Sequence, residues 1–263
     1  MPRRPPARPR ARPRDHAPEV RVCGVNACLA VAARRPEDVR RVYLDEERLP
    51  SFGVFLRECA RRRVAYHVVD HDELARVTGS VHHEGVCFLV RERPPPPLRA
   101  LLEGLAGAAT ARLLYLDGVQ NPHNLGAVLR VAAHFGVAGV LARGEGLGLS
   151  TALLRTAEGG AEWVPLVPVP SGDAPLVRAR EAGFTLVATG PRARVELYTA
   201  TLPARVVLLL GAEATGLSRE AYELADARVR IPGTGQVESL NVACAAAVAL
   251  GEHWRQHTGP RPS

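Results

Sequence analysis

The chain contains the stretch Val206-Val207-Leu208-Leu209-Leu210-Gly211-Ala212-Glu213-Ala214-Thr215-Gly216-Leu217. Its first five residues form a continuous apolar run, which is typical of a strand that is buried on both faces of a parallel sheet. The loop that follows combines one carboxylate, Glu213, with glycines that let backbone segments approach closely. Ligands of open α/β sheets bind in loops at the carboxyl ends of the strands. The stretch therefore predicts both a parallel sheet and a site beside it.

Two other polar loops share this design. One contains Asn124-Leu125-Gly126, with Arg130 four residues further on, and the other runs from Ile231-Pro232 to Ser239-Leu240-Asn241. Each joins polar side chains that can do chemistry to a glycine or proline that bends the backbone. Strands and helices alternate around these loops, which predicts an α/β domain with a parallel sheet. The pattern alone favours an unknotted, doubly wound arrangement.

The predicted elements of this half follow from apolar runs and helical spacing. The predicted strands are 113–117, 139–142, 163–167, 184–188 and 206–210, and the predicted helices are 124–135, 150–158 with Ser150 as N-cap, one that ends at 178–182, and 240–254. The half before it reads as a smaller α/β unit, with strands at 39–44, 65–69 and 86–90 and helices at 24–33, 52–62 and 72–77.

Together, the three polar loops resemble in order and spacing the motifs of the SpoU (TrmH) branch of the SPOUT methyltransferases. The matching segments are Asn124-x-Gly126-x-x-x-Arg130, Gly211-x-Glu213-x-x-Gly216-Leu217, and Ile231-Pro232 with Ser239-Leu240-Asn241. The chain departs from the family at Ala214, where glycine is frequent, and at Gly233, where methionine is usual. The resemblance spans about residues 113–254. It implies a parallel-sheet SPOUT domain with a deep trefoil knot, which methylates the ribose 2′-hydroxyl of rRNA or tRNA with S-adenosylmethionine.

The resemblance implies a catalytic set without a metal, made of Arg130, Asn124, Glu213, Ser239 and Asn241. A ribose 2′-hydroxyl is a poor nucleophile, so the enzyme must align it with the methyl group and help to remove its proton. Arginine stays protonated at neutral pH and grips phosphate with two N–H groups, so we expect Arg130 chiefly to position ribose and phosphate. The alternatives are structural: Asn124, Ser239 and Asn241 suit helix N-caps, and Glu213 suits a solvated loop.

The same resemblance implies that S-adenosylmethionine is held mainly by backbone groups, at Thr189, Gly211, Ile231 and Leu240. A Gly-x-Gly-x-x-Gly motif does not follow the first strand of this half, which argues against a dinucleotide-type methyltransferase or dehydrogenase.

Residues 19–93 resemble the RNA substrate-binding domain with an L30e-like fold that often precedes SpoU catalytic domains. The segments that carry this resemblance are Cys23-Gly24-Val25-Asn26-Ala27 and His82-His83-Glu84-Gly85-Val86. His82 and His83 fit a contact with RNA or a simple turn equally well. Four consecutive prolines, 94–97, predict a linker over residues 94–110, and residues 111–258 form the predicted catalytic domain.

Residues 1–18 form a predicted disordered tail, because arginine alternates with proline and no sizeable apolar residue follows Met1. Six arginines lie in the first fourteen residues, so they carry +6 of the formal net charge of +7. The tail suits nonspecific binding to RNA phosphates, or else it serves only solubility. It has no apolar core of a secretory signal, and no run of the sequence is apolar enough to span a membrane.

The five cysteines have no zinc spacing and lie in apolar contexts, which predicts buried thiols in a reducing cytoplasm. The resemblance implies a homodimer that pairs through the knot region and the last helix. The alternative to an enzyme is an RNA-binding or ribosome-assembly factor that keeps the fold without the activity. The intact set of polar residues favours the enzyme.

Overall fold

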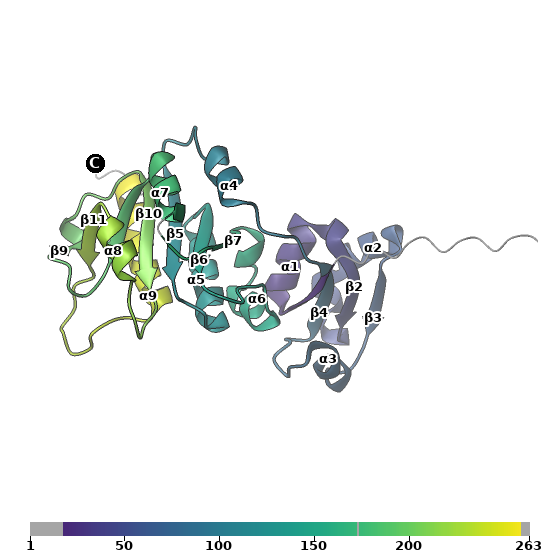
Figure 1. The fold of residues 1–263 in the computed structure, drawn as a ribbon. Helices are drawn as coiled ribbons and strands as arrows, with labels where there is room; N and C mark the ends of the chain where they lie inside the picture. The colour runs from purple at the N-terminus through teal and green to yellow at the C-terminus, as the bar shows by residue number, and fades with distance from the viewer. Residues whose placement is uncertain (1–17, 173, 259–263) are drawn as a thin grey trace, which may run out of the picture.

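The computed structural model describes residues 18–172 and 174–258. Almost all of the predicted tail, residues 1–17, therefore lies outside the described residues. The described chain forms two units, each with its own sheet, joined side by side into an elongated molecule (Figure 1).

The first unit has a four-stranded sheet with the order β1-β4-β2-β3. Its strands are β1 (Glu19–Cys23), β2 (Val39–Leu44), β3 (Ala65–Val68) and β4 (Val86–Arg91). β4 is antiparallel to both of its neighbours, whereas β3 is parallel to β2. Helices α1 (Val25–Arg34) and α2 (Leu49–Arg62) contribute to the apolar core on one face, and α3 (His71–Thr78) packs on the other.

The second unit has a seven-stranded sheet with the order β7-β6-β5-β10-β8-β11-β9, in which every neighbouring pair is parallel. Its strands are β5 (Ala111–Asp117), β6 (Gly139–Arg143), β7 (Leu166–Val169), β8 (Thr185–Thr189), β9 (Val195–Glu196), β10 (Arg205–Gly211) and β11 (Ala227–Arg230). The predicted α/β class with a parallel sheet is confirmed. β10 is inserted between β5 and β8, both of which come before it in the chain.

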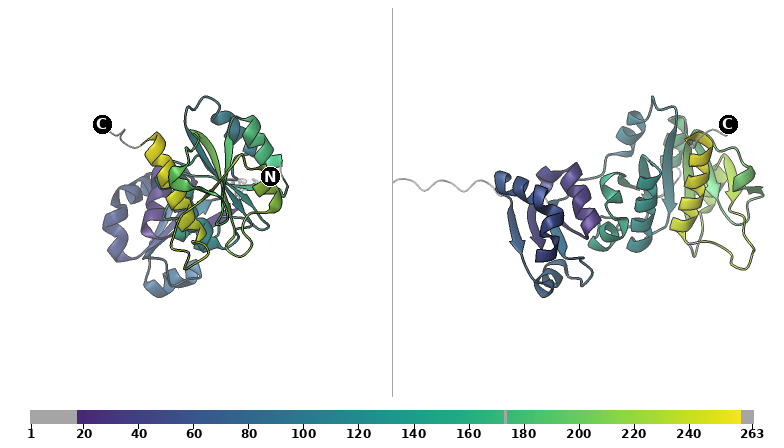
Figure 2. Two further views of the ribbon diagram at one scale, coloured as in Figure 1. Left: turned by 90° about the vertical axis from the view of Figure 1, so that its left-hand side faces the viewer. Right: turned by 180° about the vertical axis from the view of Figure 1, so that it is seen from behind.

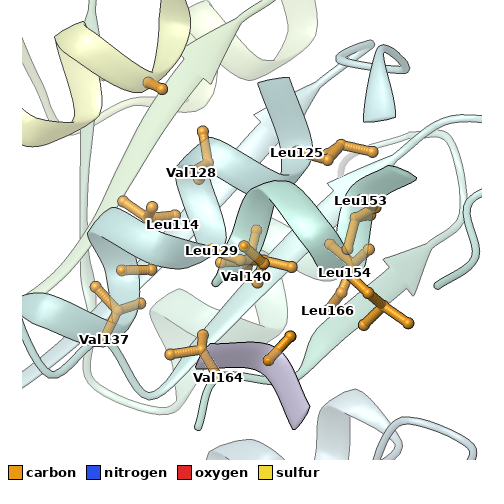
Figure 3. Close-up of a cluster of buried hydrophobic side chains, with 14 of the residues drawn as sticks. Leu114, Leu125, Val128, Leu129, Val137, Val140, Leu153, Leu154, Val164 and Leu166 are labelled. Carbon is orange, nitrogen blue, oxygen red and sulfur yellow. The ribbon is translucent and has the colours of Figure 1, made fainter. Parts of the chain in front are cut away.

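Helices cover both faces of this sheet, which explains why its central strands are apolar without alternation. One face carries α5 (Pro122–His134), α6 (Thr151–Ala157) and α9 (Val242–His257), and the other carries α4 (Leu98–Gly104), α7 (Ala174–Glu181) and α8 (Arg219–Leu224). Leu208 and Leu210 of β10 face the first group, whereas Val207 and Leu209 face the second. Figure 3 shows the packing of α5 and α6 against the sheet, and Figure 2 shows α9 in yellow along its outer surface.

Two local predictions of the fold were wrong, in addition to the start of α5 that is described with the site below. The predicted strand 163–167 begins at Leu166, because a 3₁₀ turn, η3 (Gly160–Glu162), precedes it and leaves the Trp163 side chain exposed. The second error concerns the cysteines: Cys244 is exposed on α9, whereas the other four are buried. Helix α4, which was not predicted, lies in the proline-rich linker region and buries Leu102 against the sheet.

The two units share a packed boundary. The apolar core is continuous from the first sheet to α5 and α6 of the second unit. At its edge, Arg35 forms a bidentate ion pair with Glu162, with both side chains under 10% exposed (7% and 8%). Arg34 also stacks on Trp163, with its guanidinium carbon 4.3 Å from the ring centroid. These contacts fix how the first unit sits on the second.

Candidate active site

Three predicted site residues meet at the carboxyl edge of the seven-stranded sheet. Asn124, Glu213 and Asn241, here called the amide–carboxylate cluster, come from α5, from the loop after β10 and from the start of α9. Glu213 Oε1 accepts hydrogen bonds from Asn124 Nδ2 at 3.1 Å and from Asn241 Nδ2 at 2.7 Å. Asn241 Nδ2 also lies 3.0 Å from Asn124 Oδ1. One carboxylate oxygen thus ties together three segments that are far apart in sequence.

The two asparagines reach the cluster from different helix positions. Asn241 is the N-cap of α9, and its Oδ1 accepts from Ala243 N at 2.9 Å, so one side chain both caps the helix and joins the cluster. The prediction that Asn124 opens its helix was wrong. Asn121 is the N-cap of α5, with Pro122 in the first turn, and Asn121 Oδ1 accepts from His123 N at 2.8 Å. The Asn124 amide is therefore free of capping and can serve the cluster.

The loop that carries Glu213 is held by close backbone packing. A Cβ atom on Gly211 would lie 2.0 Å from the carbonyl carbon of Gly216, so only glycine fits at this position. Gly216 N donates to Ala212 O at 2.7 Å and closes the loop.

Asp117, at the end of β5, anchors the same loop and was missed by the sequence analysis. Its Oδ2 accepts from Ser218 N at 2.8 Å, and its backbone oxygen accepts from Ala212 N at 3.0 Å. The buried Asp117 carboxylate also pairs with Arg143 at the end of β6. Burial of the Arg143 guanidinium lowers its pKa, but the hydrogen bond and the negative charge of Asp117 outweigh this effect. The pKa of Arg143 is therefore raised. An acid directly after the apolar run 113–116 was the available signal.

The predicted cofactor-binding positions gather near the cluster. Thr189, Gly211 and Ile231 lie at or just after the ends of β8, β10 and β11, which are neighbours in the sheet. Thr189 Oγ1 donates to Leu209 O at 3.0 Å, which ties β8 to β10 at this edge. Leu240 directly precedes the cluster residue Asn241 and is 44% exposed. The carboxyl edge of the sheet thus combines the backbone at three strand ends with one exposed apolar side chain.

Arg130 and Ser239 stand outside the amide–carboxylate cluster. Among the described residues, no hydrogen bond joins either side chain to the cluster, and Ser239 is exposed in the segment before α9. The Arg130 side chain is 64% exposed, and its Nη1 lies 4.0 Å from Glu158 Oε1.

Arg130 lines a cleft of about 730 Å³ between the two units, together with His82 and Arg155. The structure therefore brings the predicted RNA-contact segment and the predicted catalytic arginine into one cleft. His83, next to His82, is instead fully buried, and its Nδ1 accepts from Gly85 N at 3.1 Å, which supports the turn.

Residues 18–172 and 174–258 contain no group of three or more side chains arranged to hold a metal ion. Across these same ranges, every helix is too short or too polar to cross a membrane.

Comparison with known families identifies this architecture. The profile of the SpoU rRNA Methylase family matches residues 111–251, and that of the RNA 2′-O ribose methyltransferase substrate-binding domain matches residues 21–96. The chain belongs to the SpoU rRNA methylase family. This SpoU protein is 43% identical over 244 residues to an uncharacterized tRNA/rRNA methyltransferase, YfiF, of Escherichia coli O157:H7, and the match covers 93% of this chain and 70% of YfiF.

One further sequence relative and one solved structure are similar to this SpoU protein over most of its length. It is 36% identical over 240 residues to the 23S rRNA (guanosine-2′-O-)-methyltransferase RlmB of Nitrosomonas europaea, with 90% of this chain and 92% of RlmB covered. Among solved structures, it is similar to the SpoU methyltransferase AviRb from Streptomyces viridochromogenes in complex with AdoMet. That match has a TM-score of 0.72 and 27% identity, and it covers 90% of each chain. The predicted SPOUT fold class and SpoU family are confirmed.

Proposed function

We propose that this SpoU protein transfers the methyl group of S-adenosylmethionine to a ribose 2′-hydroxyl of structured RNA, either rRNA or tRNA. The family supports the reaction, because relatives over nearly the whole chain are named as rRNA 2′-O-methyltransferases. The observation that carries the proposal is the amide–carboxylate cluster, which lies at the carboxyl edge of the parallel sheet where such sheets bind ligands.

S-adenosylmethionine fits the residues at this edge. S-adenosylmethionine is the cofactor in the AviRb complex, and here Thr189, Gly211 and Ile231 offer backbone groups at three adjacent strand ends. Leu240 offers an exposed apolar side chain next to them. The cofactor supplies an activated methyl group on a sulfonium centre. The chain's own task is to hold the ribose in line with that methyl group and to exclude alternative poses.

The catalytic roles divide between two places in the structure. Glu213, held by two amide donors, is oriented to accept a hydrogen bond from a ribose hydroxyl through its remaining oxygen. Asn124 and Asn241 fix that carboxylate, and Ser239 offers a hydroxyl two residues before Asn241. Arg130 grips the phosphate beside the target ribose with its guanidinium.

We also propose a division of the chain into an RNA-binding unit at residues 19–93, a linker at 94–110 and a catalytic unit at 111–258. The resemblance of residues 21–96 to substrate-binding domains supports the first of these roles. The deep trefoil knot and the role of the tail in phosphate binding remain predictions. Four buried free thiols support a reducing cytoplasm as the location.

A homodimer is the proposed working form. Val237, Leu240 and Trp254 are exposed apolar side chains around the start and end of α9, which suits pairing of two copies through this helix. Light scattering on active protein at micromolar concentration tests the assembly. A monomer that is fully active would overturn the dimer.

The experiment that tests the function is transfer of a labelled methyl group from S-adenosylmethionine to total rRNA and tRNA, followed by mapping of 2′-O-methyl marks. We expect one or a few positions that are methylated only when the protein is present. If a folded protein binds no S-adenosylmethionine in calorimetry, the chain is an RNA-binding or ribosome-assembly factor on a SPOUT scaffold instead.

A further inference from the structure

The three-residue turn Glu158-Gly159-Gly160 lies directly between the two units. A Cβ atom on Gly159 would lie 2.6 Å from Ala30 Cβ and 3.1 Å from Asn26 O, so this glycine touches α1 of the first unit. A Cβ atom on Gly160 would lie 2.6 Å from Leu129 O and 3.0 Å from Arg130 Cα, so the next glycine touches α5 of the second unit. Because neither glycine has a side chain, α1 and α5 can both pack closely against this turn.

The Glu158 side chain joins the same two helices. Its Oε2 accepts a hydrogen bond from Asn26 Nδ2 of α1 at 2.7 Å. Its Oε1 lies 4.0 Å from Nη1 of Arg130 on α5. The carboxylate is thus shared between a residue of the RNA-binding unit and the arginine that the proposed reaction needs.

The backbone of Glu158 is held in a conformation that its side chain disfavours. Glu158 caps the C-terminus of α6 with φ 50° and ψ 40°, in the left-handed region that glycine or asparagine usually occupies. The chain nevertheless has the charged side chain of a glutamate at this position. A non-glycine residue in this region requires support from its surroundings, and such positions concentrate at functional sites.

We propose that Glu158 is a positioning residue that links the seating of the RNA-binding unit on α6 to the orientation of Arg130. This inference rests on the proposed function. Asn26 fixes the carboxylate from one side, and the carboxylate orients the guanidinium over the interdomain cleft from the other. RNA that is bound by the first unit therefore meets an arginine already aligned for the phosphate beside the target ribose. The effect is on rate, because an exposed ion pair of this length contributes little to stability.

Two single variants of the full chain separate the charge from the domain contact. Glu158→Gln keeps an oxygen for Asn26 but removes the charge beside Arg130. Asn26→Ala keeps that charge but frees the carboxylate from α1. We expect kcat to fall about fivefold in Glu158→Gln, which is the scale of one exposed ion pair. We expect KM for RNA, the affinity for S-adenosylmethionine and Tm to stay unchanged.

The double variant tests whether the contact with Asn26 acts through Glu158. We expect Asn26→Ala to lower kcat on its own, but to add nothing when Glu158 is already glutamine. Glu162→Gln is the matched control, since Glu162 belongs to the same segment and pairs with Arg35 across the boundary without contacting Arg130. That control should lower Tm and leave kcat per folded molecule unchanged.

The inference is overturned if Glu158→Gln keeps wild-type kcat, if it loses kcat only together with Tm, or if the two single effects multiply in the double variant. A folded wild-type chain that transfers no methyl group would refute the proposed function itself, and the inference would fall with it.

Discussion

Asn241 Nδ2 lies 2.7 Å from Glu213 Oε1, while Oδ1 of the same asparagine caps α9. The last helix and the loop after the central strand β10 are thereby fixed to each other by one side chain. Movement of α9 would displace Glu213, so the site and the proposed dimer helix are mechanically joined.

Replacement of Glu213 by alanine removes the acceptor that Asn124 and Asn241 share. We expect kcat/KM to fall about tenfold to a hundredfold, the range for hydrogen bonds to a charged group. Tm should change little, because Glu213 is exposed. Methyl-transfer kinetics check the first effect and thermal unfolding the second. Glu238→Ala, in the exposed segment before α9, is the control and should retain full activity.

Arg130→Ala should abolish methyl transfer while the affinity for S-adenosylmethionine stays near that of the wild type. Arg130 lines the cleft between the units and makes no contact with the strand ends assigned to the cofactor. Calorimetry with the cofactor, beside a turnover assay, measures both. Arg219→Ala removes an exposed arginine paired with Glu223 and should be silent. Near-normal turnover of Arg130→Ala would refute the role given to this arginine.

Gly211→Ala should disrupt the loop that carries Glu213. The added methyl group would lie 2.0 Å from the backbone carbon of Gly216, which no side-chain rotation can relieve. We expect loss of cofactor binding and a lower Tm, by about 4 °C or more if the strain exceeds ~2 kcal/mol. Gly233→Ala is the matched control, because a Cβ atom there meets nothing within 4 Å. Equal behaviour of the two variants would contradict the assigned role of close packing.

Removal of residues 1–14 should weaken RNA binding and flatten its dependence on salt. Each lost arginine–phosphate contact reduces the log–log slope by roughly 0.7 to 0.9, and this segment holds six arginines. Turnover at saturating RNA should stay the same. Filter binding at several salt concentrations measures the slope. If the shortened chain binds as tightly at low salt as the full chain, the tail has no role in binding.

Stability should fall in acid through His253. This side chain is buried, accepts from Arg112 Nε at 2.9 Å and lies 2.9 Å from Pro203 O, which requires a neutral ring. Burial, and then the charge of Arg112, lower the pKa of His253 to about 4 from 6.5. The folded state therefore binds a proton on His253 less readily than the unfolded state does. The contribution of neutral His253 to the free energy of unfolding is full above pH 6.5 and is lost as the pH falls toward 4.

Urea unfolding at pH 7 and pH 5 measures this effect against His253→Gln. The free energy of unfolding should fall less between the two pH values in the variant than in the wild type. An identical pH dependence would show that another group is responsible.

The sequence predicted most of the fold because the central strands are apolar throughout and their lengths suit strands. It located the cluster residues Asn124, Glu213 and Asn241, since the motifs name them. It missed β11 (Ala227–Arg230), whose arginines at 228 and 230 hide the pattern of a strand. Arg228 in fact folds back to donate to Tyr222 O, a contact that no local pattern reveals.

Long-range packing accounts for the other errors. Trp163 reads as a strand residue because it is aromatic, yet it is held by Arg34 from the other unit. No sequence pattern pointed to a role for Glu158, because its partners Asn26 and Arg130 lie 132 and 28 positions away in sequence. The cap of α5 was predictable, because Asn121 followed by Pro122 is a common helix start.

The placement of β10 between β5 and β8 has a consequence for synthesis of the chain. Until the residues from Arg205 onward have been synthesised, β5 and β8 lack the strand that lies between them in the finished sheet. Long-range parallel pairing of this kind is slow, and unfinished sheets expose edges that aggregate. The sheet of the nascent chain therefore lacks its central strand until the last part of the chain, from Arg205 onward, has been made. A chain that ends before Arg205 therefore lacks both Glu213 and Asn241, and with them the amide–carboxylate cluster.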